Sequence, residues 1–115
     1  MNRHERGELL HGTLELLILR TLSDGPMHGF AITERIQELS DEVLTVDDGS
    51  MYPALYRLQG RGWIEAEWGR GKKNRRAKYY RLTPAGRRAL KQAAARWSRF
   101  STAVERVLEP LLGKS

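Results

Sequence analysis

Two segments that alternate in polarity, residues 63–68 and 77–82, flank a dense basic run. Alternation with a period of two is the pattern of half-buried β-strands. Because the run between the segments contains Gly69 and Gly71, which favour turns, the pattern predicts a β-hairpin. The run reads RGKKNRRAK over residues 70–78, so six of the nine positions at the hairpin tip are Lys or Arg.

The first of three helical segments that precede the hairpin covers residues 9–22. Its apolar side chains fall on two sides of the helix, with Leu14 and Ile18 on one side and Leu19 on another. We therefore expect one side to pack on its own domain and the other side on a second surface. The Ser-Asp-Gly-Pro sequence at residues 23–26 ends the helix, because proline cannot continue the hydrogen-bond ladder.

Two further helices are expected at about residues 29–39 and 48–60. Asp47 and Ser50 are both suitable caps for the later helix. Pro53 would lie in the first turn if Ser50 is the cap and inside the helix if Asp47 is the cap, and the sequence leaves both starts open. Three helices followed by a hairpin are the order of a winged helix-turn-helix, so the predicted fold is mainly α with a small β-hairpin.

A long final helix is expected after Thr83, a suitable cap, and Pro84, a suitable first-turn residue. Its apolar residues recur at steps of three and four, as at heptad a and d positions. These residues are Leu90, Ala93, Trp97, Phe100, Val104, Val107 and Leu111. A helix over residues 84–109 would be roughly 39 Å long, more than so small a domain covers. We therefore expect residues 84–115 to form a dimerisation helix, and residues 1–83 to form a winged domain whose first helix joins the dimer interface through Leu9.

Charge is distributed unevenly along the chain. Residues 1–48 hold 4 Lys or Arg against 10 Asp or Glu, whereas residues 49–115 hold 16 against 4. Such polarity favours a nucleic-acid surface, although membrane headgroups would attract the same charge. The longest apolar stretch is too short to span a bilayer, and no cysteine is present. We expect a cytoplasmic protein that associates with the nucleoid when bound to DNA, and no membrane partner.

Double-stranded DNA is the expected partner, and each candidate contact has a structural alternative. The basic run could be a solvated loop, Tyr52 and Tyr56 could pack in the core, and Gly29 beside His28 could be a structural turn. The residues expected to contact DNA are His28, Ser50, Tyr52, Pro53, Tyr56, Arg57, Arg70, Lys72, Lys73, Asn74, Arg75, Arg76 and Lys78. The third helix would contact base edges, and the cations would contact phosphate.

Patterns that indicate catalysis are weak in this chain. The three histidines, His4, His11 and His28, lack the spacing of metal ligands, and no GxxxxGK[ST] phosphate loop is present. We expect no enzymatic activity, no metal and no cofactor.

The chain resembles the PadR family of bacterial transcriptional repressors over about residues 9–90. The resemblance rests on several short motifs in order. They are the LxxLILxxL-like first helix (residues 14–22), Gly25-Pro26-Met27-His28-Gly29-Phe30, Gly49-Ser50-Met51-Tyr52-Pro53-Ala54-Leu55, Arg57-Leu58, Gly62, Ile64 and Tyr79-Tyr80-x-Leu82-Thr83-x-x-Gly86. The family implies a homodimer whose third helix enters the major groove and whose wing contacts the flanking backbone, repressing genes until a small molecule releases it.

The single C-terminal helix is typical of the short subgroup, and Trp97-Ser98-Arg99 resembles members that sense multiple drugs. By this resemblance Gly12, Glu15, Leu16, Ala94, Trp97 and Ser101 would line a pocket for a small aromatic or hydrophobic effector. Ser101 and Ala94 stand where those members have an acidic and an aromatic residue, and Glu15 could supply a carboxylate instead. Trp97 could alternatively be a bulky residue of the dimer core.

A second class of function fits the same pattern. A dimeric winged-helix module could use its basic tip to bind acidic protein or RNA, without control by a ligand.

Overall fold

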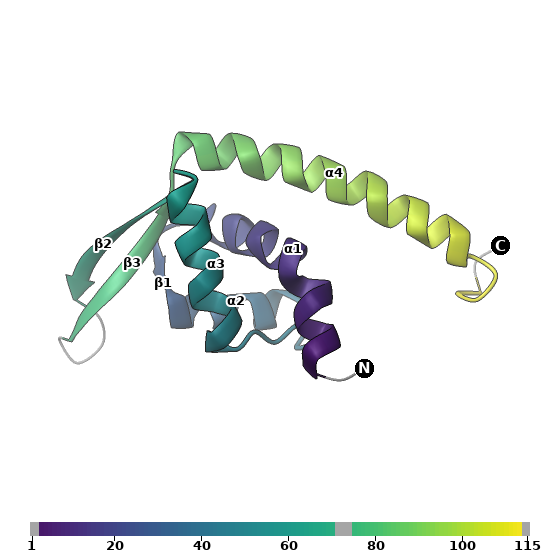
Figure 1. The fold of residues 1–115 in the computed structure, drawn as a ribbon, viewed down its shortest axis with the longest axis horizontal. Helices are drawn as coiled ribbons and strands as arrows, with labels where there is room; N and C mark the ends of the chain where they lie inside the picture. Colours follow the sequence, from purple (N-terminus) through teal and green to yellow (C-terminus); the bar gives the residue numbers. More distant parts are fainter. Residues whose placement is uncertain (1–2, 71–74, 114–115) are drawn as a thin grey trace.

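The chain folds into a winged helix-turn-helix with a long C-terminal helix (Figure 1). The computed structural model describes residues 3–70 and 75–113, with side chains from residue 12 onward. Its elements are α1 (Arg3–Leu22), β1 (Met27–His28), α2 (Gly29–Leu39), α3 (Asp48–Gly60), β2 (Ile64–Arg70), β3 (Arg76–Leu82) and α4 (Pro84–Leu108). The predicted class, mainly α with a small β-hairpin and a long C-terminal helix, is confirmed.

The structure differs from the sequence prediction at two places in the first part of the chain. Helix α1 begins at Arg3, not Leu9. The expected hairpin is part of a three-stranded antiparallel sheet with the order β1-β3-β2. Strand β1 has only two residues, Met27 and His28, which pair with Tyr80 and Tyr79. A strand this short has no polarity pattern, so only backbone pairing reveals it.

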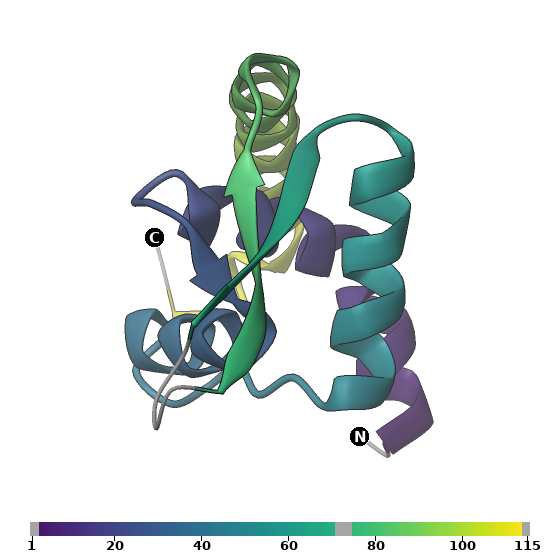
Figure 2. The ribbon, with the colours of Figure 1, turned by 90° about the vertical axis from the view of Figure 1, so that its left-hand side faces the viewer.

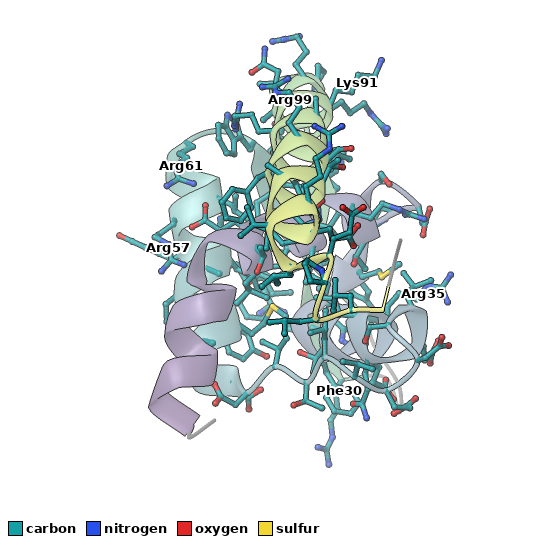
Figure 3. The ribbon with its side chains drawn as sticks, turned by 90° about the vertical axis from the view of Figure 1, so that its right-hand side faces the viewer. Phe30, Arg35, Arg57, Arg61, Lys91 and Arg99 are labelled. Carbon is teal, nitrogen blue, oxygen red and sulfur yellow. The ribbon has the colours of Figure 1, made fainter. Side chains whose placement is uncertain are left out.

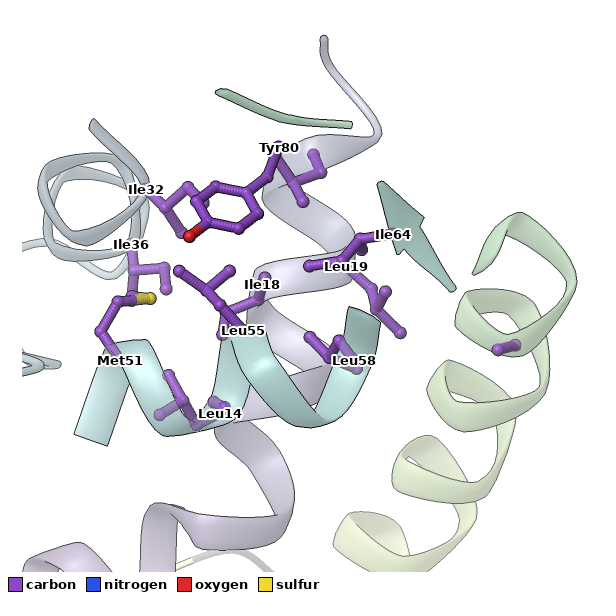
Figure 4. Close-up of a cluster of buried hydrophobic side chains, with 13 residues drawn as sticks. Leu14, Ile18, Leu19, Ile32, Ile36, Met51, Leu55, Leu58, Ile64 and Tyr80 are labelled. Atoms are coloured by element: carbon purple, nitrogen blue, oxygen red, sulfur yellow. The ribbon is translucent and has the colours of Figure 1, made fainter. Parts of the chain in front are cut away.

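One hydrophobic core joins the first three helices to the sheet (Figure 4). Helix α1 contributes Leu14, Ile18 and Leu19, and its neighbours contribute Ile32, Ile36, Met51, Leu55, Leu58, Ile64 and Tyr80. Leu19 was expected on the second apolar side of its helix, but it is 1% exposed and belongs to this core. That part of the prediction was wrong because the sheet and α4 cover α1 from a side that helical spacing alone does not identify.

Asp47 caps α3, which settles the choice that the sequence left open. Its Oδ1 accepts a hydrogen bond from the Ser50 backbone N–H at 2.9 Å. Pro53 therefore lies inside the helix, where its missing N–H removes one bond of the ladder. The ring is exposed, so the interruption occurs on the outer side of α3.

The start of α4 is fixed to the turn between α3 and β2. The Thr83 hydroxyl donates to the Gly62 carbonyl at 2.7 Å and accepts from the Gly86 N–H at 3.0 Å, while the Thr83 N–H donates to the Trp63 carbonyl. A Cβ on Gly86 would lie 2.0 Å from the Trp63 carbonyl oxygen. Helix α4 therefore approaches the turn so closely that its first turn requires glycine.

From this junction α4 runs past α1 and projects beyond the rest of the domain (Figure 1). The molecule is accordingly elongated, with extents of 54 × 30 × 22 Å. Several large apolar side chains on the distal half of α4 and just beyond it are exposed. They are Trp97, Phe100, Val104, Val107, Leu108, Leu111 and Leu112.

Replacing Gly86 by Ala should lower the free energy of unfolding by about 3 kcal/mol, because the added methyl group meets backbone and not a side chain that can move. Urea denaturation followed by circular dichroism measures the change. Gly60→Ala is the matched control, since a Cβ there meets nothing within 4 Å and alanine favours a helix. Equal losses in the two variants would contradict the close approach at Gly86.

Candidate nucleic-acid interface

Helix α3 presents a polar and aromatic face away from the core. Met51, Ala54, Leu55 and Leu58 are buried, whereas Tyr52 is 48% and Tyr56 79% exposed. Both tyrosines therefore lie outside the core, which removes the alternative that either packs inside it. Together with Pro53 they form the outer surface of α3 that a ligand of the domain would meet.

Tyr52 is held against the start of α2. A Cβ on Gly29 would lie 3.1 Å from the Tyr52 ring and hydroxyl, so a side chain at this position would push the Tyr52 ring outward by a few tenths of an ångström. Gly29 thus has a packing role that its place in the sequence does not reveal.

Burial raises the pKa of Tyr80 above its ordinary value, and the nearby Tyr52 raises that pKa further.

His28 caps α2 through its ring. Its Nδ1 accepts from the Ala31 N–H at 3.2 Å, and the ring meets Tyr79 edge-on with centroids 5.6 Å apart. One of the free N–H groups at this helix end is therefore already used by the chain itself. Because Nδ1 accepts, the neutral ring carries its proton on Nε2.

The two long strands, which form the wing, have chemically different faces. Residues directly opposite in an antiparallel pair share a face. One face carries the pairs Ile64–Leu82, Ala66–Tyr80, Trp68–Lys78 and Arg70–Arg76. On the other face Arg81 bonds Glu65 at 2.9 Å and lies 3.9 Å from Glu67. We call the distal part of the first face, formed by Trp68, Arg70, Arg76 and Lys78, the cationic wing face.

The described cations of the wing are all exposed. The Arg76 guanidinium lies 5.0 Å from the centre of the Trp68 ring, and Lys78 Nζ lies 5.9 Å from that of Tyr80. Arg70 and Arg75 complete the set, whereas Lys72, Lys73 and Asn74 lie outside the described residues. Trp68 lies on the same face of the strand as the buried Ile64, yet it is 60% exposed because the wing extends past the core.

A carboxylate on α1 binds two arginines of the α3 region, Arg57 and Arg61. Figure 3 shows these two arginines on the same side of the molecule. Glu15 Oε2 accepts from Arg57 Nε at 2.8 Å, and Oε1 accepts from Arg61. The sequence suggested that Arg57 contacts DNA and Glu15 lines a ligand pocket, so their pairing was not anticipated. Burial alone would raise the pKa of Glu15, but the hydrogen bonds and charges of Arg57 and Arg61 outweigh burial and lower it.

The suggested pocket residues lie on α1 and α4, which pack against each other. Gly12 and Ala94 are exposed, Leu16 is half-buried and Trp97 is 45% exposed. The Ser101 hydroxyl donates to the Ser98 carbonyl of its own helix. Within the single chain, only Glu15 of this group binds a charged partner.

The suggested dimer residues fall into three groups. Leu90 packs partly against the chain's own core and Ala93 is half-buried. Trp97, Phe100, Val104 and Val107 are exposed on α4, and the Trp97 and Phe100 ring centres are 6.0 Å apart. Leu111 lies beyond the end of α4, and the side chain of Leu9 lies outside the described residues.

Two negative findings apply to the described part of the chain. None of its helices combines the length and apolar character needed to cross a membrane. No three His, Asp or Glu side chains within it are grouped as metal ligands would be.

Replacing Glu15 by Gln should lower the free energy of unfolding by about 1–2 kcal/mol at pH 7, because two arginines lose their carboxylate. A carboxyl group with a lowered folded pKa contributes stability fully above its ordinary pKa of 4.5 and loses it as pH falls through the folded value. The difference between wild type and variant should therefore shrink below about pH 4.5.

Urea denaturation at pH 7, 5, 4 and 3 measures this difference. Glu65→Gln is the control, since the Glu65 pair with Arg81 is exposed on both sides and its loss should change little. A Glu15 effect that persists undiminished at pH 3 would show that charge is not its cause.

Comparisons with known proteins agree with this geometry. A model of the transcriptional regulator PadR-like family matches residues 18–92, and a transcriptional regulator of Mycobacterium tuberculosis is 39% identical over 83 residues, 72% of this chain and 74% of that protein. A PadR family transcriptional regulator from Eggerthella lenta has a TM-score of 0.72 at 33% identity, over 89% of this chain and 87% of that one. A transcriptional regulator from Clostridium thermocellum has a TM-score of 0.78 at 27% identity, over 86% and 96%.

The matched range contains α2, α3, the whole sheet and the junction with α4. These are the elements that carry the exposed tyrosines, the cap of α2 and the cationic wing face. The chain belongs to the PadR-like family of DNA-binding transcriptional regulators.

Proposed function

We propose that this chain is a homodimeric repressor that binds an inverted-repeat operator through α3 and the wing. One observation carries the proposal: α2, the start of α3 and the distal parts of β2 and β3 lie at one end of the domain, opposite the start of α4 (Figure 2). The exposed tyrosines and the described cations of the wing belong to α3 and to these strands. Helix α3 would contact bases in the major groove through Ser50, Tyr52, Pro53 and Tyr56, and the wing would contact flanking phosphates. A dimer with twofold symmetry would place its two DNA-binding domains on two half-sites related by the same symmetry, which is an inverted repeat.

Arg57 has a narrower role in this proposal than its position alone suggests. Because its Nε is bound to Glu15, the side chain lies on the flank of α3 nearest α1. It would contact the DNA backbone with its remaining N–H groups, whereas Tyr52 and Tyr56 lie on the exposed face.

Dimerisation would occur through residues 84–115, and residues 1–83 would form the DNA-binding domain. The exposed apolar side chains of α4 support this division, since a contiguous apolar surface of this kind usually marks an interface. Trp97 and Phe100 are the largest of them, and aromatic residues are enriched where subunits meet.

We further propose that a small aromatic or hydrophobic ligand binds beside Trp97 and releases the DNA. The exposed indole offers a flat apolar surface, and Glu15 lies on the neighbouring helix. A ligand with different affinity for two dimer shapes would shift the angle between the two DNA-binding domains.

The alternative is a dimeric module whose wing binds acidic protein or RNA. The exposed tyrosines of α3 favour DNA, because a module that needed only charge would not require them. A gel shift with the region upstream of the chain's own gene separates the two functions. Specific retention of that DNA supports repression, and its absence at low salt supports the module.

Replacing Arg70, Arg76 and Lys78 by Ala should weaken binding to all duplex sequences. If each cation releases about one counterion, the slope of log K against log salt should fall by about 2–3. Fluorescence anisotropy of labelled duplex at several salt concentrations measures the slope.

The matched control removes Arg87, Arg88 and Lys91, three exposed cations on α4. This variant has the same net charge but keeps the cationic wing face, so its slope should remain that of wild type. Equal slopes in the two variants would mean that the wing contacts no phosphate.

For the ligand, planar aromatic compounds that quench tryptophan fluorescence in wild type should bind Trp97→Ala at least about tenfold more weakly, because the stacking surface is lost. Isothermal titration calorimetry measures these affinities without depending on the fluorescence of Trp97, which the variant lacks. Full retention of affinity by Trp97→Ala would refute stacking on this residue.

A further inference from the structure

Trp68 is an exposed indole in a strongly cationic setting. It lies within β2 at 60% exposure, with Lys78 directly opposite and Arg76 stacked over its ring at 5.0 Å. Arg70 follows on the same face of the strand. One exposed aromatic side chain alone would need no explanation, but Trp68 shares its face of the wing with three cations, so this face offers an apolar contact and positive charge together.

Charge identifies the chemistry of that partner. The described strand residues of the cationic wing face, Trp68, Arg70, Arg76 and Lys78, include no Asp or Glu, whereas the opposite face carries Glu65 and Glu67 beside Arg81. A polyanion would therefore be attracted to the Trp68 face and repelled by the carboxylates of the other. A second copy of the wing would bring like charges together, which disfavours self-association through this face.

We infer that Trp68 is a further DNA-contacting residue, whose indole packs on the sugars of the duplex backbone and aligns the Arg76 guanidinium with a phosphate. The inference rests on the proposed function and adds a residue to it. The Arg76 guanidinium carbon lies over the indole at 5.0 Å from the ring centre. A guanidinium that contacts the face of an aromatic ring can still donate N–H groups to phosphate oxygens. Trp68 thus combines an apolar contact with the positioning of a charge.

The position of Trp68 in the molecule agrees with this role. In Figure 1 the wing and the distal half of α4 extend in different directions from their common junction, so a dimer joined through α4 would leave the wing uncovered. Figure 2 shows the distal strands reaching the same end of the domain as α2 and the start of α3. DNA against α3 would therefore lie beside the cationic wing face.

Anisotropy titrations of duplex DNA at several salt concentrations test the inference with Trp68→Ala, Trp68→Phe and Arg76→Ala. Trp68→Ala should weaken binding about tenfold with little change in salt slope, because no charge is removed. Arg76→Ala should lower the slope by about 0.9. Duplex DNA should quench the tryptophan emission of wild type. Trp68→Phe should recover most of the affinity, since a flat ring remains, but should lose this quenching.

Trp63→Phe is the matched control, because Trp63 is also stacked with an arginine, Arg61 at 5.1 Å, but lies at the base of the wing. It should keep both affinity and quenching, and melting temperatures confirm that each variant is folded. If wild type binds duplex and Trp68→Ala binds equally well, the inference fails while the proposed function stands. If wild type binds no duplex at low salt, both fail. A larger loss on single-stranded than on duplex DNA would overturn the duplex contact in favour of base stacking.

Discussion

The close approach of α4 to the turn between α3 and β2 determines how the whole molecule is arranged. Thr83, which caps α4, takes part in three hydrogen bonds. Together with the absence of a side chain at Gly86, they fix the first turn of α4 against Trp63. The same short stretch connects the wing, α3 and α4. It therefore directs the apolar half of α4 away from the surface where α3 and the wing meet.

This arrangement separates two exposed surfaces of different character. One end of the domain is cationic and aromatic, with Tyr52, Tyr56 and the cationic wing face exposed, and the projecting half of α4 is apolar and aromatic. Helix α1 packs against the first part of α4 in the shared core, and through Glu15 it contacts Arg57 and Arg61 of the α3 region. A change in how α1 packs on α4 would accordingly move Glu15 and so shift Arg57 and Arg61. This is a physical route by which the proposed dimer could influence the proposed binding of DNA.

The sequence predicts most of this fold because its local signals agree with one another. The alternation of residues 77–82, the Thr83-Pro84 cap and the periodic apolar residues of α3 each correspond to an observed element. Strand β1 could not be predicted, since two residues carry no pattern. The sequence could not choose between Asp47 and Ser50 as the cap of α3, because either side chain can accept a backbone hydrogen bond, and only the structure shows that Asp47 accepts it from the Ser50 N–H.

The candidate site was less predictable than the fold, because its residues depend on contacts across the chain. Nothing local links Glu15 to Arg57 and Arg61, or Gly29 to the Tyr52 ring. Trp68 fits the alternating pattern of a half-buried strand, and only the length of the wing beyond the core exposes it. Alternating polarity and charge density together identified the wing, but the face that carries its cations required the strand register.

Hydrogen exchange of the protein with and without a duplex from the region upstream of its own gene would test the central claim most directly. The account predicts added protection in the first turn of α2, in α3 and in the wing strands, with none in residues 98–108 of α4. Protection confined to α4, or no protection anywhere at low salt, would contradict a DNA surface formed by α3 and the wing.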